Sequence, residues 1–342
     1  MIRRARLFVA LARPPVLVLL AMFCSTGLAA GGGGDQLQRL FPALVVVMAF
    51  LVFSVAVNDL ADEAIDRVNL PGDAGRPLVT GNATRREMAR VAVGAGALAL
   101  VTSTTLRWQV VLVVAAGLTF SAAYSLPPAR VSGRGALASM LLPAAYVAVP
   151  FLVGAFSAGP ALTRREIALV GGLYIGFIGR ILLKDFRDVR GDALFGKRTF
   201  LVRHGRRQTC LTSLVCWVTA PVVLALCGYG PPVLLVAYGA LAVVAVLLLR
   251  MLSSARGARR DERLIAALAI VGRGTVLVLL AELDMTTAKW PSVATTMVLS
   301  ALTVITLGQA HAMARRGPVT RCRVPSTWAG TPALAGVRHP GP

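Results

Sequence analysis

Two groups of aspartates with the same spacing stand at the ends of apolar segments, in a chain that has only 15 acidic residues. In each group the carboxylates recur at positions i, i+3 and i+7, which lie on one face of an α-helix. Aligned carboxylates repel one another unless a cation lies between them, and hard oxygen ligands suit Mg²⁺. The spacing therefore predicts a divalent metal site, with the metal carried by a polyphosphate. The groups are Asp59, Asp62 and Asp66, with Asn58 as a neutral oxygen ligand, and Asp185, Asp188 and Asp192.

Basic residues surround the second aspartate group and indicate which anion the metal would carry. A diphosphate needs metal ions that bridge its oxygens and cations that neutralise its charge as it leaves. Arg180 falls inside an apolar segment, where an arginine is costly unless it faces a polar cavity. The alternative is that these residues form salt bridges with the aspartates at the membrane interface. The set comprises Arg180, Lys184, Arg187, Arg190, Lys197 and Arg198.

The elements that must position these residues are membrane helices. Hydrophobic residues make up 56% of the chain, its mean hydropathy is +0.72, and apolar runs long enough to span a membrane recur throughout. We therefore expect an all-α, polytopic membrane bundle of nine or ten transmembrane helices. The predicted spans are residues 7–30, 40–57, 88–106, 108–126, 136–157, 166–183, 209–228, 231–251, 264–281 and 291–312.

The two ends of the chain need separate interpretations. The basic and apolar N-terminal run is typical of a signal peptide, but Arg13-Pro14-Pro15 comes early in it and no clear cleavage site follows. We therefore expect a retained first helix. Residues 313–342 are rich in Pro, Gly and Arg and show no periodicity, which predicts a disordered basic tail. The membrane domain is accordingly expected to occupy residues 1–312.

The net charge of +21 reports topology rather than nucleic-acid binding. If the N-terminus is cytoplasmic, the great majority of Lys and Arg fall in the N-terminus, the alternate loops on the same side and the tail, as the positive-inside rule requires. This assigns both aspartate groups to the cytoplasmic face of the cell membrane. No nucleic-acid motif is present. The opposite loops hold Arg39, Arg107, Arg164, Arg165 and Lys289, while Arg180 and Arg273 fall inside spans.

Two loops on the predicted cytoplasmic side complete a recognisable set. Arg76-Pro77 follows the first aspartate group, and Tyr124-Ser125-Leu126-Pro127-Pro128 ends a helix sharply because proline restricts the residue before it. With the two Asp-x-x-Asp-x-x-x-Asp groups and Gly196-Lys197-Arg198-Thr199, the chain resembles the UbiA superfamily of intramembrane prenyltransferases. The resemblance spans most of the helical region, although ten spans would exceed the nine that are usual in this superfamily.

The resemblance implies a Mg²⁺-dependent transfer of a prenyl group from a polyprenyl diphosphate to an aromatic or other small acceptor, or to a lipid acceptor. By the same match, Asn58 and the first three aspartates would hold one Mg²⁺, and Asp185, Asp188 and Asp192 the other. The diphosphate would be bound by Arg76, Lys184, Arg187, Lys197 and Arg198. Of these, Arg76, Lys184 and Arg187 would also act catalytically, together with Tyr124.

The residues around the predicted metal site give further expectations about the substrates. Helical spacing places Tyr174, Ile178, Ile181 and Asp185 on one stripe with Phe177 beside it, which would form an apolar, partly aromatic wall for an isoprenoid chain with cation–π support. Ordinary helix packing explains the same pattern. Tyr124 could orient the acceptor or assist its deprotonation, although a phenol is a poor base. Arg273 either binds an anionic acceptor group or reaches a neighbouring carbonyl.

Two other functions are compatible with a helical membrane protein. An intramembrane terpene cyclase would use the same metal groups without an external acceptor. A transporter or channel would have polar or broken helices at the membrane midplane. The ionisable residues of this chain gather mainly at one face, which favours an enzyme.

Overall fold

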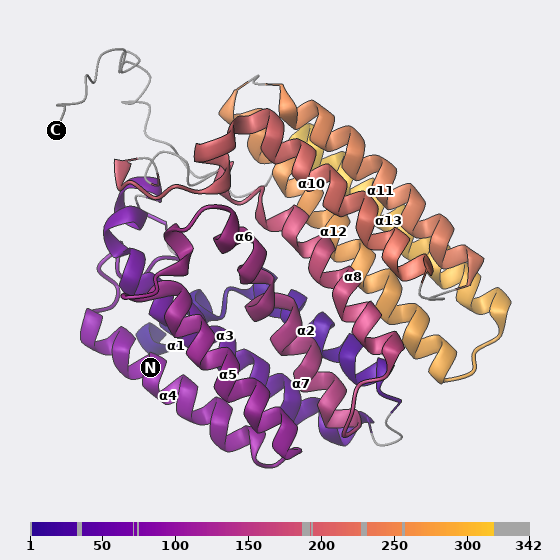
Figure 1. Cartoon of the computed structure of the whole chain (residues 1–342), viewed down its shortest axis with the longest axis horizontal. Coiled ribbons are helices and arrows are strands. Elements are labelled where there is room, and N and C mark those ends of the chain that lie inside the picture. The colour runs from indigo at the N-terminus through magenta and orange to yellow at the C-terminus, as the bar shows by residue number, and fades with distance from the viewer. Residues whose placement is uncertain are drawn as a thin grey trace.

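The computed structural model describes residues 2–32, 36–70, 72–73, 75–186, 192, 194–226, 231–254 and 257–317, and within these ranges every regular element is helical. Helices α1 to α7 pack together, α8 to α13 form a second group, and the two groups meet where α2 contacts α12 and where α8 contacts α6 and η2 (Figure 1). The elements are α1 (Ile2–Ala12), α2 (Pro14–Ala30), α3 (Gln36–Asn69), α4 (Arg85–Ser103), α5 (Trp108–Ser125), η1 (Val131–Gly133), α6 (Ala136–Pro143), η2 (Ala144–Ala148), α7 (Val149–Ala158), α8 (Arg164–Ile181), α10 (Phe200–Leu226), α11 (Pro232–Ser253), α12 (Ala258–Thr287) and α13 (Ser292–Arg316).

The predicted polytopic membrane bundle is confirmed. In the described part of the chain, 7 helices are long and apolar enough to cross a membrane, and α2 is a shorter apolar helix. The helices α4 and α8 lie outside this set, since each begins with a cluster of charged residues in its first turn. Each of the ten predicted segments coincides with helical structure, while the number that crosses the membrane stays a prediction.

The first predicted span is not one continuous helix. Arg13 adopts a left-handed conformation (φ 42°, ψ 72°), which ends α1 at Ala12 and lets α2 begin at Pro14. A proline is well tolerated at the start of a helix because its missing N–H would have no partner there. The break separates a short N-terminal helix from α2, whose Leu19, Phe23 and Leu28 are buried in the bundle.

The second predicted span is longer than the apolar run from which it was inferred. Helix α3 continues past residue 57 to Asn69, so the first aspartate group lies on the helix itself. The fifth span, by contrast, is interrupted: α6 ends at Pro143, the π-helical turn η2 follows, and α7 begins at Val149. Proline inside a helix removes a backbone hydrogen bond, and wide turns of this kind often occur at functional sites.

The close approach of α2 and α7 depends on a pair of glycines. A Cβ on Gly154 would overlap the carbonyl oxygen of Cys24, and a Cβ on Gly27 would overlap that of Phe151. Small residues at a helix crossing allow the backbones to come within van der Waals contact, which is a main source of association energy inside a membrane. These two positions therefore fix α7, and with it η2, against the core of the bundle.

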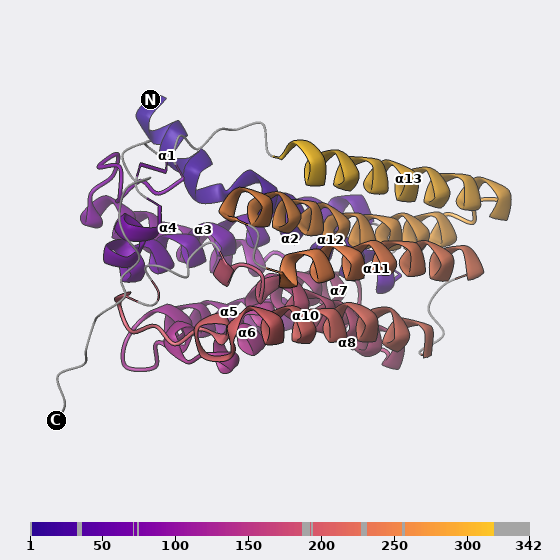
Figure 2. The same cartoon turned by 90° about the horizontal axis from the view of Figure 1, so that it is seen from above.

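Helix α13 lies along one edge of the bundle against α12, as the view from above shows (Figure 2). It extends beyond the predicted last span to Arg316, and Gly274 of α12 packs closely against Thr306 of α13. The predicted tail therefore starts within the last turn of α13. Its residues 318–342 lie outside the described part of the chain.

Candidate active site

The first aspartate group forms a buried acidic face on α3. Asp59, Asp62 and Asp66 are 2%, 5% and 7% exposed, which is the single helical face predicted from their spacing. Asn58 donates a hydrogen bond from Nδ2 to Asp62 Oδ2 at 3.1 Å. Glu63, within the same motif, serves a structural purpose because it pairs with Arg67 and Arg85 and so joins α3 to α4. Helix α3 therefore presents one buried acidic face and, through Glu63, a second face that is linked to α4.

Two arginines from different loops meet at Asp59. Arg76 contacts Asp59 Oδ1 and lies 3.1 Å from Asp66 Oδ2, so one guanidinium spans the length of the acidic face. The Arg76 backbone is fixed by its N–H, which donates to Asp73 O at 2.9 Å. Arg13 Nη2 reaches the same Asp59 oxygen at 2.8 Å from the break between α1 and α2. The structure thus brings the predicted Arg76, and the unpredicted Arg13, to the first group.

Lys197 joins the two aspartate groups. Its Nζ lies 3.3 Å from Asp62 Oδ2 on α3 and 3.8 Å from Asp192 Oδ1 of the second group. The local cause is Gly196, whose positive φ of 68° turns the chain so that the Lys197 N–H donates to Asp192 O at 2.7 Å. Asp192 is itself only 2% exposed. Two motifs separated widely in the sequence therefore face each other across one ammonium group.

The first group offers oxygen ligands that the protein leaves unsatisfied. Asp59 Oδ2 and Asp62 Oδ1 are buried without a hydrogen-bond partner, and the cation that reaches Asp62 Oδ1 is Arg130 Nη2 at 3.6 Å. Buried polar atoms are seldom left in this state. Within the described ranges no three acidic, His or Cys side chains are grouped closely enough to hold a metal ion, and cations lie among the carboxylates. The donor set, carboxylate and amide oxygens, is nevertheless the one that Mg²⁺ prefers.

The second group borders a polar pocket with about 380 Å³ of empty space. Tyr124, Lys184 and Asp185 line this pocket together with Asp192 and Lys197, so five predicted site residues share one cavity. Ser132, whose buried Oγ has no hydrogen-bond partner, lines it as well. Helix α5 ends at Ser125, the residue after Tyr124, close to the predicted end.

Three predicted residues are not brought to the site by the described structure. Arg187 and Asp188 lie outside the described residues. Arg198 is exposed, and within the described ranges it has no hydrogen bond or ion pair with either aspartate group. Its role in binding diphosphate stays a prediction.

The helix leading into the second group ends earlier than expected. Helix α8 stops at Ile181, where turns with i to i+3 hydrogen bonds replace the α-helix: Leu183 N donates to Arg180 O and Lys184 N to Ile181 O. A continuous stripe from Tyr174 to Asp185 is therefore wrong. Asp185 follows these turns, and the ring of its neighbour Phe186 lies 5.0 Å beneath Arg206, which is paired with Asp261.

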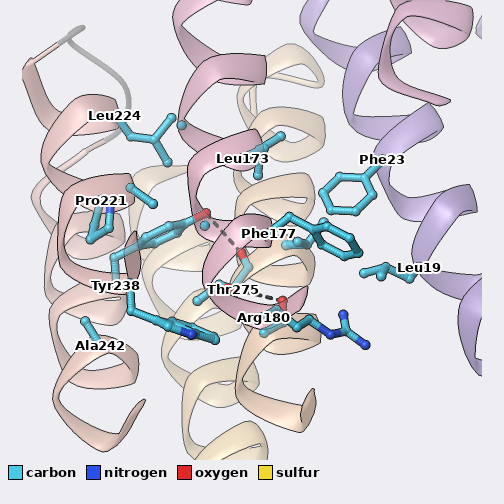
Figure 3. Close-up of a pocket in the computed structure, with 16 residues that line it drawn as sticks. Leu19, Phe23, Leu173, Phe177, Arg180, Pro221, Leu224, Tyr238, Ala242 and Thr275 are labelled. Carbon is cyan, nitrogen blue, oxygen red and sulfur yellow. Dashed lines mark hydrogen bonds between the residues drawn. The ribbon is translucent and has the colours of Figure 1, made fainter. Parts of the chain in front are cut away.

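A second, apolar chamber lies on another face of α8. It has about 580 Å³ of empty space and is bordered by α2, α8, α10, α11 and α12 (Figure 3). Phe177 lines it with three other aromatic residues, Phe23, Trp217 and Tyr238, and packs against Phe23 at 6.0 Å and Tyr146 at 5.6 Å between ring centroids. Tyr174 instead donates to Met140 O at 2.7 Å. Both residues are thus engaged in packing contacts, and a role of Phe177 toward an isoprenoid chain stays a prediction.

Sequence reasoning missed three residues of this region, and each depends on long-range folding. Arg13 reaches Asp59 across the bundle, and its one signal is the Arg-Pro-Pro break in an apolar run. Arg130 follows the Pro127-Pro128 turn and had no assigned partner. Tyr146, on the π-helical turn, could have been found only from the prolines at positions 143 and 150 that interrupt its helix.

Comparison with known proteins identifies the family. The model described as UbiA prenyltransferase family matches residues 18–271. The chain belongs to the UbiA prenyltransferase family. This UbiA-family protein is thus an enzyme of the prenyltransferase class and an integral, multi-pass membrane protein.

Named relatives and solved structures agree with this family. The bacteriochlorophyll synthase 34 kDa chain of Chloroflexus aurantiacus is 28% identical over 222 residues, which cover 64% of this UbiA-family chain and 68% of the relative. A digeranylgeranylglyceryl phosphate synthase of Methanoculleus marisnigri is 30% identical over 213 residues, covering 61% and 72%. A UbiA homolog from Archaeoglobus fulgidus bound to DMAPP and Mg²⁺ shares the fold with a TM-score of 0.54 at 16% identity, covering 90% and 98%.

Proposed function

We propose that this enzyme transfers a prenyl group from a prenyl diphosphate to a small-molecule or lipid acceptor within the membrane, in a Mg²⁺-dependent reaction. The observation that carries the proposal is the Lys197 ammonium between Asp62 and Asp192, since it joins both aspartate groups and their cations in one centre. Solved relatives bound to DMAPP or GPP together with Mg²⁺ support the substrate class and the metal.

Acidic residues of the chain would hold the metal, and basic residues would bind the diphosphate. Asn58, Asp59, Asp62 and Asp66 would hold one Mg²⁺, and Asp185, Asp188 and Asp192 the other. When bound, Mg²⁺ would neutralise diphosphate oxygens and so stabilise the leaving group. Arg76, Lys184, Arg187 and Lys197 would bind the diphosphate directly, with Arg13 and Arg130 as additional cations beside the acidic face.

The reaction follows from what this arrangement can stabilise. The C1–O bond of the prenyl diphosphate breaks, its electron pair leaves with the diphosphate, and the acceptor forms a new bond to C1 and releases a proton. Preorganised cations lower the barrier because they face the charge as it develops. Aromatic faces such as Phe177 favour a nearby carbocation, and apolar walls exclude the water that would capture it. Tyr124, beside Lys184 in the polar pocket, would orient the acceptor.

We further propose that the centre faces the cytoplasm, at the cell membrane. The support is the concentration of Lys and Arg in the N-terminus and in alternate loops on the side of the aspartate groups. Labelling of a R198C variant by a membrane-impermeant thiol reagent tests this orientation, because Arg198 is exposed. Reaction in inside-out vesicles but not in intact cells is the expected result, and the opposite pattern overturns the orientation.

The test of activity uses purified enzyme in vesicles of its host's lipids, with geranyl diphosphate and Mg²⁺. Mass spectrometry of the extract is expected to show a new prenylated compound that is absent without Mg²⁺ and absent with Asp59→Asn. A cyclic hydrocarbon or alcohol formed from geranyl diphosphate without any acceptor would instead establish a terpene cyclase. Release of no diphosphate under any of these conditions would refute both.

A further inference from the structure

The wall of the apolar chamber has a marked chemical asymmetry. The chamber holds about 580 Å³ of empty space, which includes space open to its surroundings. Most of its wall is apolar or aromatic. Among the described residues that line it none is acidic, and the charged one is Arg180, near the end of α8.

Arg180 lines this end of the chamber, and a second arginine lies beside it on α12, outside the lining residues. The Arg180 side chain crosses from α8 to α12, where its Cδ lies 3.7 Å from the Cβ position of Gly272. Arg273 is the next residue, and it is near enough for its charge to repel that of Arg180. The Arg180 guanidinium carbon lies 5.6 Å from the centroid of the Phe177 ring. The Arg180 side chain extends beneath that ring toward Leu19 (Figure 3).

Neither arginine is neutralised by the part of the protein that the structure describes. No hydrogen bond or ion pair to a described residue is made by Arg180 or Arg273, so the expectation that Arg273 bonds a neighbouring carbonyl is not met there. A cationic side chain inside a membrane normally pairs with an acidic side chain, with a backbone carbonyl or with a substrate. Among the described residues neither arginine has a counterion, so an oxyanion from outside the chain would supply one.

A third donor in the chamber wall supports the same conclusion. Trp217 lines the chamber, is 6% exposed, and its Nε1 has no hydrogen-bond partner. The hydroxyls nearby are already used, since Tyr238 donates to Thr275 O at 3.1 Å and Thr275 to Gly272 O at 2.9 Å. What the wall offers a ligand is thus N–H donors, which an oxyanion can accept and a neutral apolar molecule cannot.

The chamber adjoins the polar pocket across the last turn of α8. Arg180 lines the chamber, while the next residue, Ile181, and Lys184 line the polar pocket. A molecule in the chamber would therefore lie beside the prenyl diphosphate. The position suits the second substrate of a transferase better than a structural lipid on the outer surface of the bundle.

We propose that the chamber is the acceptor pocket and that Arg180 and Arg273 select an acceptor with an apolar body and an oxyanion, either carboxylate or phosphate. This inference rests on the proposed function. Trp217 Nε1 supplies one further donor, and Phe177 and Tyr238 contact the apolar body. The enzyme consequently prefers anionic acceptors to neutral ones of the same size.

The test measures this preference with the diphosphate site already filled. Purified enzyme is saturated with Mg²⁺ and geranyl thiolodiphosphate, which does not ionise readily, and is titrated with 4-dodecyloxybenzoate or with 4-dodecyloxybenzamide. Wild type is expected to bind the benzoate at least tenfold more tightly. Arg180→Gln and Arg273→Gln each remove most of this preference, while Arg250→Gln, on the exposed end of α11, retains it.

Conservative variants separate a binding role from a folding role. Arg180→Lys keeps a charge without the planar guanidinium, so it should retain part of the preference, and every variant should still bind geranyl thiolodiphosphate with Mg²⁺. An equal affinity for benzoate and benzamide in wild type overturns the inference, as does an unchanged preference in both Gln variants. If wild type binds no thiolodiphosphate, the proposed function fails instead.

A membrane lipid is the other source of an oxyanion, and a second arm distinguishes it. In phosphatidylcholine nanodiscs, addition of phosphatidylglycerol is expected to leave the benzoate affinity unchanged, and the prenylated product formed from host lipid extract is expected to ionise as an anion. Displacement of the benzoate by phosphatidylglycerol, together with a neutral product, would assign the site to a lipid headgroup and overturn its assignment to the acceptor.

Discussion

Lys197→Gln is expected to weaken the binding of prenyl diphosphate more than any change at the neighbouring Arg198. Lys197 Nζ stands 3.3 Å from one aspartate and 3.8 Å from another, at the centre of the site, whereas Arg198 is exposed. Because glutamine removes the charge but keeps a side chain of similar length, it deletes the cation with little change in packing. The adjacent Arg198→Gln variant is the matched control.

The magnitude follows from the number of bonds that the ammonium can make to the diphosphate. One hydrogen bond to a charged group contributes about 1.5–3 kcal/mol, so its loss should raise the Kd of geranyl thiolodiphosphate by roughly ten- to 150-fold. Removing the ammonium also leaves Asp62 and Asp192 facing each other without a cation. The Mg²⁺ concentration that half-saturates binding should therefore not rise, which separates loss of a diphosphate contact from loss of a metal ligand.

Isothermal titration calorimetry of the purified variants with geranyl thiolodiphosphate, at several Mg²⁺ concentrations, measures both quantities without an acceptor. Asp62→Asn provides the contrast, because it should raise the Mg²⁺ requirement. The reasoning is refuted if Lys197→Gln binds as wild type does, or if Arg198→Gln causes the larger loss.

Three further predictions concern the scaffold of the site. Arg13→Gln removes a half-buried partner of Asp59, so it should weaken Mg²⁺-dependent binding of geranyl thiolodiphosphate by about tenfold, equivalent to ~1.4 kcal/mol, in the same calorimetric assay. Arg206→Met leaves Asp261 without its partner and should lower thermal stability by about 1–3 kcal/mol, as measured by unfolding in detergent, whereas exchanging the two residues should restore part of the loss. Gly154→Ala should reduce the yield of folded protein on size-exclusion chromatography, because the added methyl overlaps a backbone carbonyl of α2, while Gly171→Ala, whose Cβ meets open space, should not.

Specific outcomes would contradict these three expectations. Arg67→Gln is the control for Arg13. It alters the exposed Arg67–Glu63 pair on α3, the helix that carries Asp59, and should change binding little. A similar effect of both variants would mean that Arg13 acts only through overall charge. An Arg206–Asp261 exchange with no recovery would show that the orientation of the pair or the Phe186 contact dominates. A stable Gly154→Ala variant would mean that α2 and α7 can separate without disrupting the bundle.

The sequence alone was sufficient for features that depend on local spacing. The i, i+3, i+7 recurrence of Asp59, Asp62 and Asp66 specifies a helical face wherever the helix lies, and apolar run length specifies membrane helices. The distribution of Lys and Arg also assigned both groups to one side of the membrane, although it did not predict that Lys197 would contact both. These expectations needed no knowledge of how the helices pack.

Other features could not be read from the sequence because they depend on tertiary contacts. The end of α8 at Ile181 has no proline or glycine to announce it, and Arg13 meets Asp59 only after α1 and α2 fold back onto α3. The sequence also did not show which face of α8 lines the chamber, since the helix is apolar on several sides. The better signal was the glycines at positions 172 and 176, which line the chamber and let α8 approach α10 closely.

The interleaving of cations with carboxylates has a consequence for the order in which ligands can enter. Among the described contacts, Asp59, Asp62, Asp66 and Asp192 are matched by Arg13, Arg76, Arg130 and Lys197, so the resting centre is close to electrically neutral. A lone Mg²⁺ would meet these cations, and a lone diphosphate would meet the carboxylates. Entering as a pair, each relieves the repulsion that the other suffers. Metal and diphosphate must then raise each other's affinity by the same factor. The protein without diphosphate would therefore bind Mg²⁺ weakly.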